Sequence, residues 1–308
     1  MSEVEDIYPS RQAAEPQIIP RKDPVIYGEW REGAPLTREQ TDSYARNGFL
    51  ALDAVFSADE VAILKEEAAR LHAGPAGLDA DTVIAEPGSG AVRSVFKAHG
   101  QSDLFHRLAS DARLAGVASF LLNDDVYIHQ SRLNYKPGFQ GKDFYWHSDF
   151  ETWHVEDGMP RMRALSMSVL LTDNLAVNGP TMFIPGSHEH FVACVGETPE
   201  DHYKKSLKKQ EYGVPDEQIL AEFARQSGVA APTGAAGSVV IFDCNILHGS
   251  NSNITPFPRS NAFFVFNAVS NRLVAPFGPE KPRPEFIGAR VNARALKPID
   301  GRIEKYAA

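Results

Sequence analysis

The sequence predicts a mostly β protein with flanking helices, built on a double-stranded β-helix, or jelly-roll, core. Helical periodicity is confined to the first 122 residues and to a short stretch at 199–227, whereas strand-like segments dominate from residue 125 onward. Those segments are rich in β-branched and aromatic residues and are bounded by Pro, Gly and Asn. Helices followed by a β-rich segment favour a double-sheet jelly roll with a helical layer on one face.

The N-terminal part is expected to be an arm followed by helices. Residues 1–35 are rich in proline and charge and predict an extended arm. Two capping boxes follow, Thr37–Gln40 and Ser57–Glu60, and each precedes helical periodicity. A glycine- and proline-rich loop is expected over 74–91, and a helix over 102–122. We expect residues 36–308 to form a single catalytic domain whose N-terminal layer is helical.

The β-rich part is expected to contain strands at 126–135, 164–171, 181–184, 238–242 and 261–269. Two short helices are expected between them, over 199–227. Pro199 and Pro215 stand where a helix start tolerates proline, and Gly228 follows as a candidate C-terminal cap.

Composition excludes several classes of function. The net charge of −9 argues against nucleic-acid binding, which needs a basic patch. No apolar run approaches the length of a membrane-spanning helix. The acidic N-terminus lacks the basic and apolar regions of a signal peptide. Cys194 and Cys244 give neither a disulfide framework nor zinc spacing, so we expect a cytoplasmic protein.

A candidate metal site is formed by the motif His147-Ser148-Asp149 and, later in the chain, His248. If the motif lies on a strand, alternation places His147 and Asp149 on one face and Ser148 on the other. Each of these residues alone would more often be structural. Together, two imidazoles and one carboxylate form the facial triad of non-haem Fe(II) oxygenases, which leaves three coordination positions open.

Arg259 strengthens this hypothesis. It follows His248 at the head of an apolar strand. A planar guanidinium binds a carboxylate through two parallel hydrogen bonds, as the far carboxylate of a 2-oxoglutarate cosubstrate requires. Alone, it would more often be a solvated surface charge.

The residues around the motif carry a resemblance to a known family. The run FYWHSDFETWH at 144–154 resembles the ectoine hydroxylases, within the phytanoyl-CoA-dioxygenase-like branch of the Fe(II)/2-oxoglutarate oxygenases. The likeness extends through QSRLNYKPG at 130–138, NGPTMFIPGSH at 178–188 and HGSNSN at 248–253. It covers most of residues 20–290, and no metal position departs from the pattern.

The resemblance implies hydroxylation of ectoine, a compatible solute, to 5-hydroxyectoine. Fe(II) would be the metal, 2-oxoglutarate and O2 would be consumed, and succinate and CO2 released. It also implies a homodimer. The residues it implies are the Fe(II) ligands His147, Asp149 and His248, the 2-oxoglutarate set Asn134, Lys136, Ser250 and Arg259, and the substrate contacts Gln130, Thr152, Trp153 and Phe266.

These implied roles are chemically reasonable. Ser250 and Arg259 offer a hydroxyl and a cation to one carboxylate. Gln130 offers a donor and an acceptor to a zwitterion, and the ring of Trp153 or Phe266 suits the amidinium of ectoine. Core packing is the alternative for Phe266, because it lies on an apolar strand.

Two nearby residues are expected to act indirectly. His154 falls outside the triad spacing, which favours a structural or rim role. Glu151 is expected to orient its neighbours rather than to act as a base.

Two alternative functions stay open. A related Fe(II)/2-oxoglutarate hydroxylase could act on another small amino acid or acyl substrate. A non-enzymatic cupin-like module could bind a metal or ligand.

Overall fold

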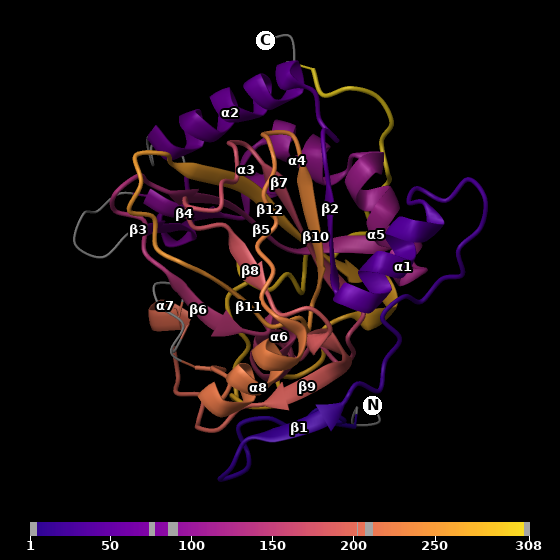
Figure 1. Ribbon diagram of the computed structural model, residues 1–308, viewed down its shortest axis with the longest axis vertical. Coiled ribbons are helices and arrows are strands. Elements are labelled where there is room, and N and C mark those ends of the chain that lie inside the picture. The colour runs from indigo at the N-terminus through magenta and orange to yellow at the C-terminus, as the bar shows by residue number, and fades with distance from the viewer. Residues whose placement is uncertain (1–4, 74–77, 86–91, 202, 207–211, 305–308) are drawn as a thin grey trace.

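Two layers of antiparallel strands face each other and build the core of the molecule (Figure 1). The computed structural model describes residues 5–73, 78–85, 92–201, 203–206 and 212–304. The larger sheet has seven strands in the order β2-β10-β7-β12-β5-β4-β3. These strands are β2 (Phe49–Leu52), β3 (Val83–Ala85), β4 (Val92–Phe96), β5 (Val126–Lys136), β7 (Ala164–Leu170), β10 (Val239–Asp243) and β12 (Arg259–Ala268).

The opposing layer consists of two small sheets. One has the order β6-β11-β8, and the other pairs β1 with β9. Its strands are β1 (Gln17–Pro20), β6 (Phe144–His147), β8 (Thr181–Phe183), β9 (His190–Ala193) and β11 (His248–Ser250). Because β1 belongs to the N-terminal arm, the arm completes this layer.

Most of the N-terminal helices cover the outer face of the larger sheet. The helices are α1 (Arg38–Asn47), α2 (Ala58–Ala73), α3 (Ala98–Gln101), α4 (Asp103–Ala109), α5 (Val117–Leu122), α6 (Asp149–Asp157), α7 (Tyr203–Ser206) and α8 (Glu217–Ser227). None of the helices in these described parts is long and apolar enough to cross a membrane.

The two largest apolar cores result from this layering. One lies between the helices and the larger sheet and includes Leu64, Leu108 and Phe264. The other lies between the facing sheets and includes Phe150, Phe242 and Phe263. Successive residues of β12 thus enter different cores, as strand alternation requires. The jelly roll with a helical layer that the sequence predicts is confirmed.

A bulge in β5 decides which of its side chains face the opposing layer. Val265 of β12 pairs with Gln130, whereas Phe266 pairs with Ile128, so β5 has one extra residue, His129. The extra residue reverses the alternation. Ile128 therefore packs in the helical core, while Gln130 faces the interior between the sheets.

The predicted elements are present with two differences. Each predicted strand of the β-rich part is found within two residues of its expected ends. Both capping boxes form, and Gly228 ends α8 with a positive φ of 74°.

Both differences concern the N-terminal part of the chain. The helix expected over 102–122 is broken after Ala109, because the side chain of Asp111 accepts from the amide of Arg113 and starts a π-helical turn at Ala112–Gly116. Within the expected loop 74–91, residues 74–77 and 86–91 lie outside the described residues, while a 3-10 turn at Ala80–Thr82 and β3 occupy 80–85. Of the helices expected over 199–227, both are present as α7 and α8, although residues 202 and 207–211 are not described.

Candidate metal centre and adjoining pockets

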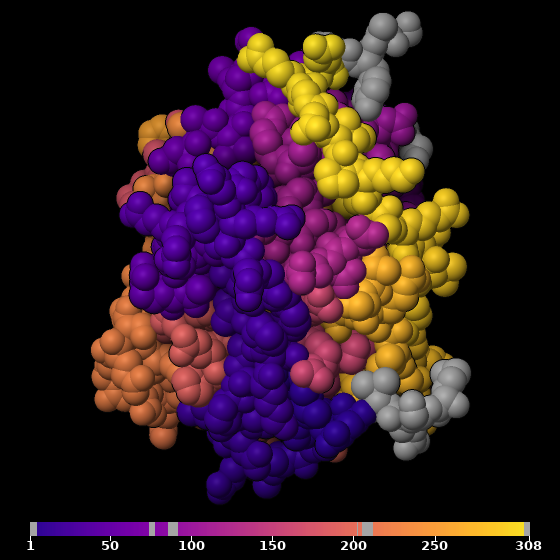
Figure 2. Space-filling view, turned by 90° about the vertical axis from the view of Figure 1, so that its right-hand side faces the viewer, coloured from indigo at the N-terminus to yellow at the C-terminus, as the bar shows by residue number. Residues whose placement is uncertain are grey.

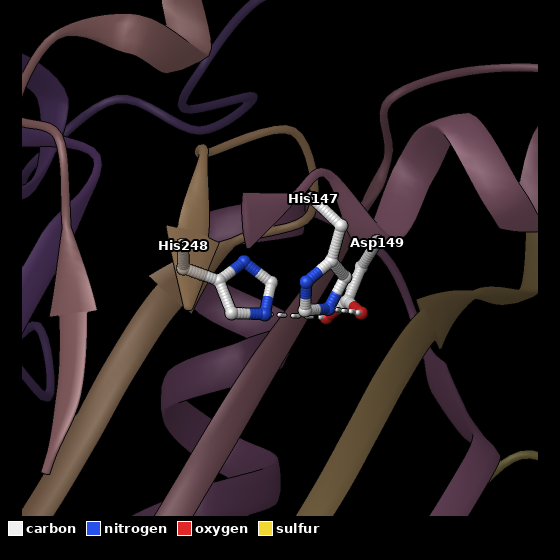
Figure 3. A group of neighbouring side chains, drawn as sticks. All are labelled: His147, Asp149 and His248. Carbon is white, nitrogen blue, oxygen red and sulfur yellow. Dashed lines mark ion pairs between the residues drawn. The ribbon is translucent and has the colours of Figure 1, made fainter. Parts of the chain in front are cut away.

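The three predicted metal ligands converge at one point between the sheets (Figure 3). β11 pairs with β6 so that His248 lies directly opposite His147, with ring centroids 4.2 Å apart. Asp149 approaches from the start of α6. One ligand atom from each of the three side chains lies within 4.8 Å of the other two. The three side chains can therefore contact a single ion.

The local structure that places Asp149 differs from the expected one. A continuous strand through the motif is wrong, because β6 ends at His147 and Ser148 caps the next helix. The Ser148 hydroxyl accepts from the amide of Glu151 at 3.4 Å and donates to Asn245 Oδ1 at 3.2 Å. Serine is a preferred N-cap residue, and this local preference overrides strand alternation.

Both histidines present the same nitrogen to the site. Nδ1 of His147 donates to the backbone carbonyl of Tyr145 at 2.8 Å, and Nδ1 of His248 donates to that of Ile246 at 3.0 Å. A carbonyl only accepts, so the proton is on Nδ1 and the lone pair of each Nε2 faces Asp149. A backbone carbonyl often fixes a metal-binding histidine in this way.

Burial sets the charges of the ligands. It lowers the pKa of His248 to about 4, with the neighbouring His147 acting in the same direction, so the His248 ring is neutral at pH 7. Burial opposes ionisation of Asp149, but the charge that His248 and His147 carry when protonated, together with that of Arg132, outweighs it and holds the pKa of that carboxyl well below its usual range, so a proton binds a histidine before it binds Asp149. A neutral imidazole and a buried carboxylate are donors that suit divalent iron.

One pocket beside the metal ligands, the Arg259 pocket, contains the predicted cosubstrate residues. Arg259 opens β12 directly opposite Lys136 of β5. Asn134, Lys136, Ser250 and Arg259 all line this pocket together with His147 and His248. Lys136 Nζ donates to Ser250 Oγ at 2.9 Å, which fixes the position of that hydroxyl.

Arg259 is a buried cation that has no carboxylate partner in the described part of the chain. Arg259 is only 7% exposed, and its Nε has no hydrogen-bond partner among the described residues. Burial, with the charge of Arg93, lowers its pKa to about 10. A guanidinium in this environment is costly unless an anion binds it. The pocket therefore fits a carboxylate ligand.

A second pocket, the Trp153 pocket, lies on another side of the metal ligands. Gln130, Thr152 and Trp153 line it, together with His147 and Asp149. Gln130 donates from Nε2 to the carbonyl of Ile287 at 2.8 Å and is held there. The two pockets share Arg132, Phe144 and His147, so they meet at the candidate metal centre.

Phe266 is not brought to either pocket. It is fully buried in the helical core, 6.4 Å from the ring of Phe264. On β12 the site-facing positions are Arg259, Asn261 and Phe263. Alternation sends Phe264 and Phe266 to the other face. The expected substrate contact is therefore replaced by core packing.

Several lining residues were missed by sequence reasoning. Arg132 is partly buried, and its guanidinium lies 4.3 Å from the ring centroid of Phe263. It shares a strand face with Asn134 and Lys136, so alternation on β5 could have found it. Arg283 lines the Trp153 pocket from an irregular C-terminal segment, where no periodicity points to it.

His154 and Glu151 have structural partners. His154 is fully buried and contacts the carbonyl of Met159 and the carboxylate of Asp6. Glu151 points to the N-terminal arm, where it accepts hydrogen bonds from Arg11. Neither residue is a ligand in the metal cluster.

Comparison with known proteins identifies the family. The phytanoyl-CoA dioxygenase (PhyH) family model matches residues 44–261. The chain is 63% identical over 294 residues to the ectoine dioxygenase of Sphingopyxis alaskensis, covering 96% of each chain. It is 55% identical to that of Stutzerimonas stutzeri, covering 98% of this chain and 99% of the relative.

Solved structures give the same result. The crystal structure of EctD from S. alaskensis with 2-oxoglutarate and 5-hydroxyectoine matches with a TM-score of 0.90 and 57% identity, over 97% of this chain and 100% of the other. The structure of that protein with bound Fe matches with a TM-score of 0.89 and 56% identity, at the same coverage. The chain therefore belongs to the phytanoyl-CoA dioxygenase (PhyH) family and, within it, to the ectoine dioxygenases.

Proposed function

We propose that this protein is an Fe(II)- and 2-oxoglutarate-dependent dioxygenase that hydroxylates ectoine to 5-hydroxyectoine. O2 is consumed, and succinate and CO2 are released. The single observation that carries the proposal is the meeting of two pockets at His147, Asp149 and His248. The similarity to ectoine dioxygenases over nearly the full chain supports the choice of substrate.

His147, Asp149 and His248 would hold the iron. Two imidazole nitrogens and one carboxylate fit Fe(II) and leave room for a chelating cosubstrate and O2. Bound Fe(II) supplies the redox chemistry that couples decarboxylation of 2-oxoglutarate to hydroxylation of the substrate. The protein fixes the ligand geometry through the backbone hydrogen bonds of both histidines.

The Arg259 pocket would bind 2-oxoglutarate. The guanidinium of Arg259, whose Nε has no hydrogen-bond partner among the described residues, supplies the charge for the C5 carboxylate, and Ser250, held by Lys136, supplies a hydroxyl. Asn134 lies on the same strand face as Lys136 and lines the same pocket. These groups bind and orient the cosubstrate with its other end toward the metal ligands.

The Trp153 pocket would bind ectoine, a small cyclic amidinium carboxylate. Trp153 offers an aromatic face to the delocalised cation, and Gln130 and Thr152 offer hydrogen bonds. Arg132 and Arg283 bring positive charge to the same pocket, and Glu156 brings negative charge. Groups of both signs suit a zwitterion better than a simple anion or cation.

A product assay tests the proposal. Purified protein is incubated with Fe(II), 2-oxoglutarate and O2, with and without ectoine, and succinate and hydroxylated ectoine are measured by mass spectrometry. We expect slow succinate formation without ectoine, and faster formation with ectoine that matches hydroxyectoine in amount. Succinate without hydroxyectoine would indicate an oxygenase for another small solute. A complete lack of succinate would indicate a binding module.

We further propose that the protein is a cytoplasmic homodimer. Cys194 and Cys244 are both free and buried, which suits a reducing compartment. The homodimer rests on the family resemblance, and light scattering after size-exclusion chromatography tests it. A monomeric mass would contradict it.

A further inference from the structure

The N-terminal arm contacts the helix that carries much of the candidate site. In Figure 2 the arm, in indigo, runs down the face of the molecule. The side chain of its residue Arg11 is almost completely enclosed, with only 2% of it exposed. The guanidinium donates to both carboxylate oxygens of Glu151, from Nε at 3.0 Å and from Nη2 at 2.7 Å. It also donates from Nη1 to Glu156 Oε1 at 2.7 Å.

These two partners belong to α6, on which several parts of the site depend. Asp149 is the first residue of α6, and Thr152, Trp153 and Glu156 of the same helix line the Trp153 pocket. A shift of α6 would therefore move a metal ligand and a wall of the substrate pocket together. Arg11 binds this helix at two positions, Glu151 and Glu156, and these bonds restrain both the translation and the rotation of the helix.

The backbone at Arg11 supports a specific role. Its φ is 59°, in the left-handed region that residues with a Cβ rarely adopt. Such a conformation persists only when the surrounding contacts impose it. Here the imposing contacts are the side-chain bonds to α6 and a backbone bond from the Arg11 amide to the carbonyl of Cys194.

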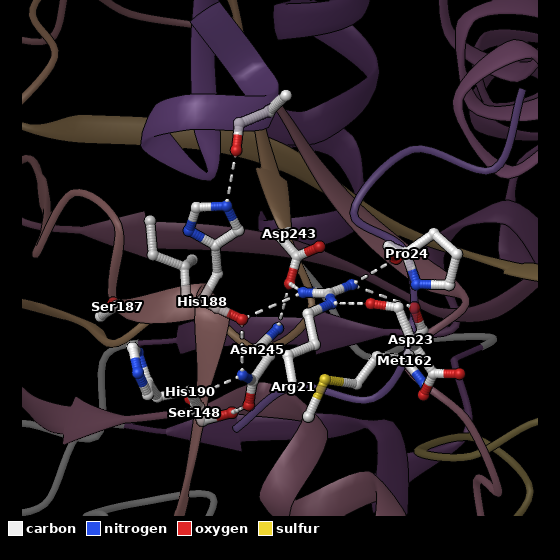
Figure 4. A network of polar contacts seen from close by, with 12 residues as sticks. Arg21, Asp23, Pro24, Ser148, Met162, Ser187, His188, His190, Asp243 and Asn245 are labelled. Atoms are coloured by element: carbon white, nitrogen blue, oxygen red, sulfur yellow. Dashed lines mark hydrogen bonds and ion pairs between the residues drawn. The ribbon is translucent and has the colours of Figure 1, made fainter. Parts of the chain in front are cut away.

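The arm also reaches the start of α6 by a second route (Figure 4). Arg21 Nη1 donates to Asp243 Oδ1 at 2.8 Å, and the same oxygen accepts from the amide of Asn245 at 2.8 Å. Asn245 Oδ1 in turn accepts from Ser148, the cap of α6 that lies between two predicted metal ligands. The cap and the body of α6 are thus both tied to residues of the arm.

We propose that Arg11 is a positioning residue, which sets the place of α6 and through it the metal affinity of the site and the alignment of the substrate. This inference rests on the metal site of the proposed function. It assigns to the arm a role in the reaction, in addition to its role as the edge of the β1-β9 sheet. A purely structural arginine would affect stability alone.

The test compares two Arg11 variants with a control elsewhere in the molecule. Arg11→Met removes all the bonds to α6. Arg11→Lys keeps the charge, so that the buried carboxylates retain a counter-ion, but an ammonium cannot span both carboxylates as the planar fork does. The control is Arg113→Met. Arg113 likewise binds two carboxylates, Asp111 and Glu60, but in the helical layer and away from α6.

Two quantities are measured for each folded protein. Co(II), a redox-stable probe, is titrated into the metal-free protein by calorimetry, and the ratio of hydroxyectoine to succinate is measured in the Fe(II) enzyme. We expect Arg11→Met to weaken Co(II) binding by about tenfold or more, as loss of an outer support of a metal site does. The ratio should also fall. Arg11→Lys should show a smaller loss of the same kind, and Arg113→Met should change neither quantity.

The outcomes separate this inference from the proposed function. If Arg11→Met does not fold, Arg11→Lys decides the question. Wild-type Co(II) affinity and coupling in a folded Arg11 variant would overturn the inference. So would an equal loss in Arg113→Met, because the effect would then be one of stability. Failure of the wild-type protein to bind Co(II) would instead reject the metal site itself.

Discussion

Three side chains from separate elements form the candidate metal centre, and their chemistry depends on what surrounds each of them. His147 ends β6, His248 begins β11, and Asp149 begins α6. Backbone carbonyls direct both Nε2 atoms inward, and the Asp149 carboxyl stays ionised despite its burial because a proton binds a neighbouring histidine first. This environment prepares the donors before a metal binds.

Loss of any one ligand should abolish catalysis without unfolding the protein. We expect His147→Ala, Asp149→Ala and His248→Ala each to eliminate hydroxylation, because two remaining ligands bind the ion weakly and with poor geometry. Bound iron, product formation and the circular dichroism spectrum are measured for each variant. Full activity in one of them would remove that residue from the ligand set.

Arg259 should act on cosubstrate binding. We expect Arg259→Ala to raise the KM for 2-oxoglutarate far more than that for ectoine, with a loss of about 2–5 kcal/mol when the carboxylate loses its charged partner. Arg259→Lys should rescue only part of this loss. The two KM values are compared by steady-state kinetics. An unchanged KM for 2-oxoglutarate in the alanine variant would contradict the role.

Trp153 and Phe266 should respond differently, because only Trp153 lines a pocket. Trp153→Ala should lower the ratio of hydroxyectoine to succinate, since the substrate loses a stacking surface that contributes about 0.5–2 kcal/mol. Phe266→Leu should leave this ratio unchanged and reduce the free energy of unfolding by about 0.5–3 kcal/mol. Both variants are assayed for product ratio and by urea denaturation. A lower ratio of hydroxyectoine to succinate in Phe266→Leu, with an unchanged ratio in Trp153→Ala, would show that Phe266 contacts the substrate.

At the residue scale, the sequence predicted which residues form the site better than it predicted what each side chain contacts. The ligands and Arg259 were predictable because their chemistry and spacing leave few alternatives. Whether Phe266 faces the site depends on which alternate residues of β12 point to which side of the sheet. The sequence does not reveal this, because both faces of the strand are buried and both sets of residues are therefore mostly apolar. Arg283 was not predictable, because tertiary packing alone brings an irregular segment to the pocket.

At the element scale, local hydrogen bonds determine where helices begin, and a local bulge determines which side chains of β5 face the site. The capping boxes of α1 and α2 form as predicted, since they depend only on residues within one turn. The cap at Ser148 was missed, although its bond to the Glu151 amide is equally local, because strand alternation explained the motif as well. The bulge at His129 has no sequence signal, yet it turns Gln130 toward the site.

The start of α2 should make stability sensitive to acid. Burial opposes ionisation of Glu60, but hydrogen bonds from Arg113 and from the amides of Ile303 and Ser57 outweigh it and lower its pKa from 4.5 to about 2. A carboxyl with a depressed pKa stabilises the folded state above its unfolded pKa. Its contribution is present above pH 4.5 and is lost as the pH falls toward about 2.

We therefore expect Glu60→Gln to unfold more easily than wild type at pH 7, and the difference to shrink as the pH falls below 4.5. Urea denaturation across this range measures the free energy of unfolding of both proteins. A difference that stays constant with pH would show that the charge of Glu60 does not contribute.

At the scale of the whole molecule, the site lies between the two facing sheets, with the arm and the C-terminal segment closing around α6. Arg11 from the arm and Arg283 from the C-terminal segment both contact Glu156. The layered architecture was predictable from the order of helices and strands. The contacts of the N-terminal arm and of the C-terminal segment with α6 were not predictable, because they join residues that are far apart in sequence. The division into an arm of residues 1–35 and one catalytic domain of residues 36–308 remains a proposal.

The central claim is that the two pockets meeting at His147, Asp149 and His248 couple 2-oxoglutarate turnover to ectoine hydroxylation. The most direct measurement follows isotopically labelled O2 in a reaction with Fe(II), 2-oxoglutarate and ectoine. We expect equal amounts of succinate and hydroxyectoine, with one oxygen of O2 in the succinate carboxylate and the other in the new hydroxyl. Label in succinate while ectoine stays unchanged, or unlabelled succinate and hydroxyectoine, would contradict the claim.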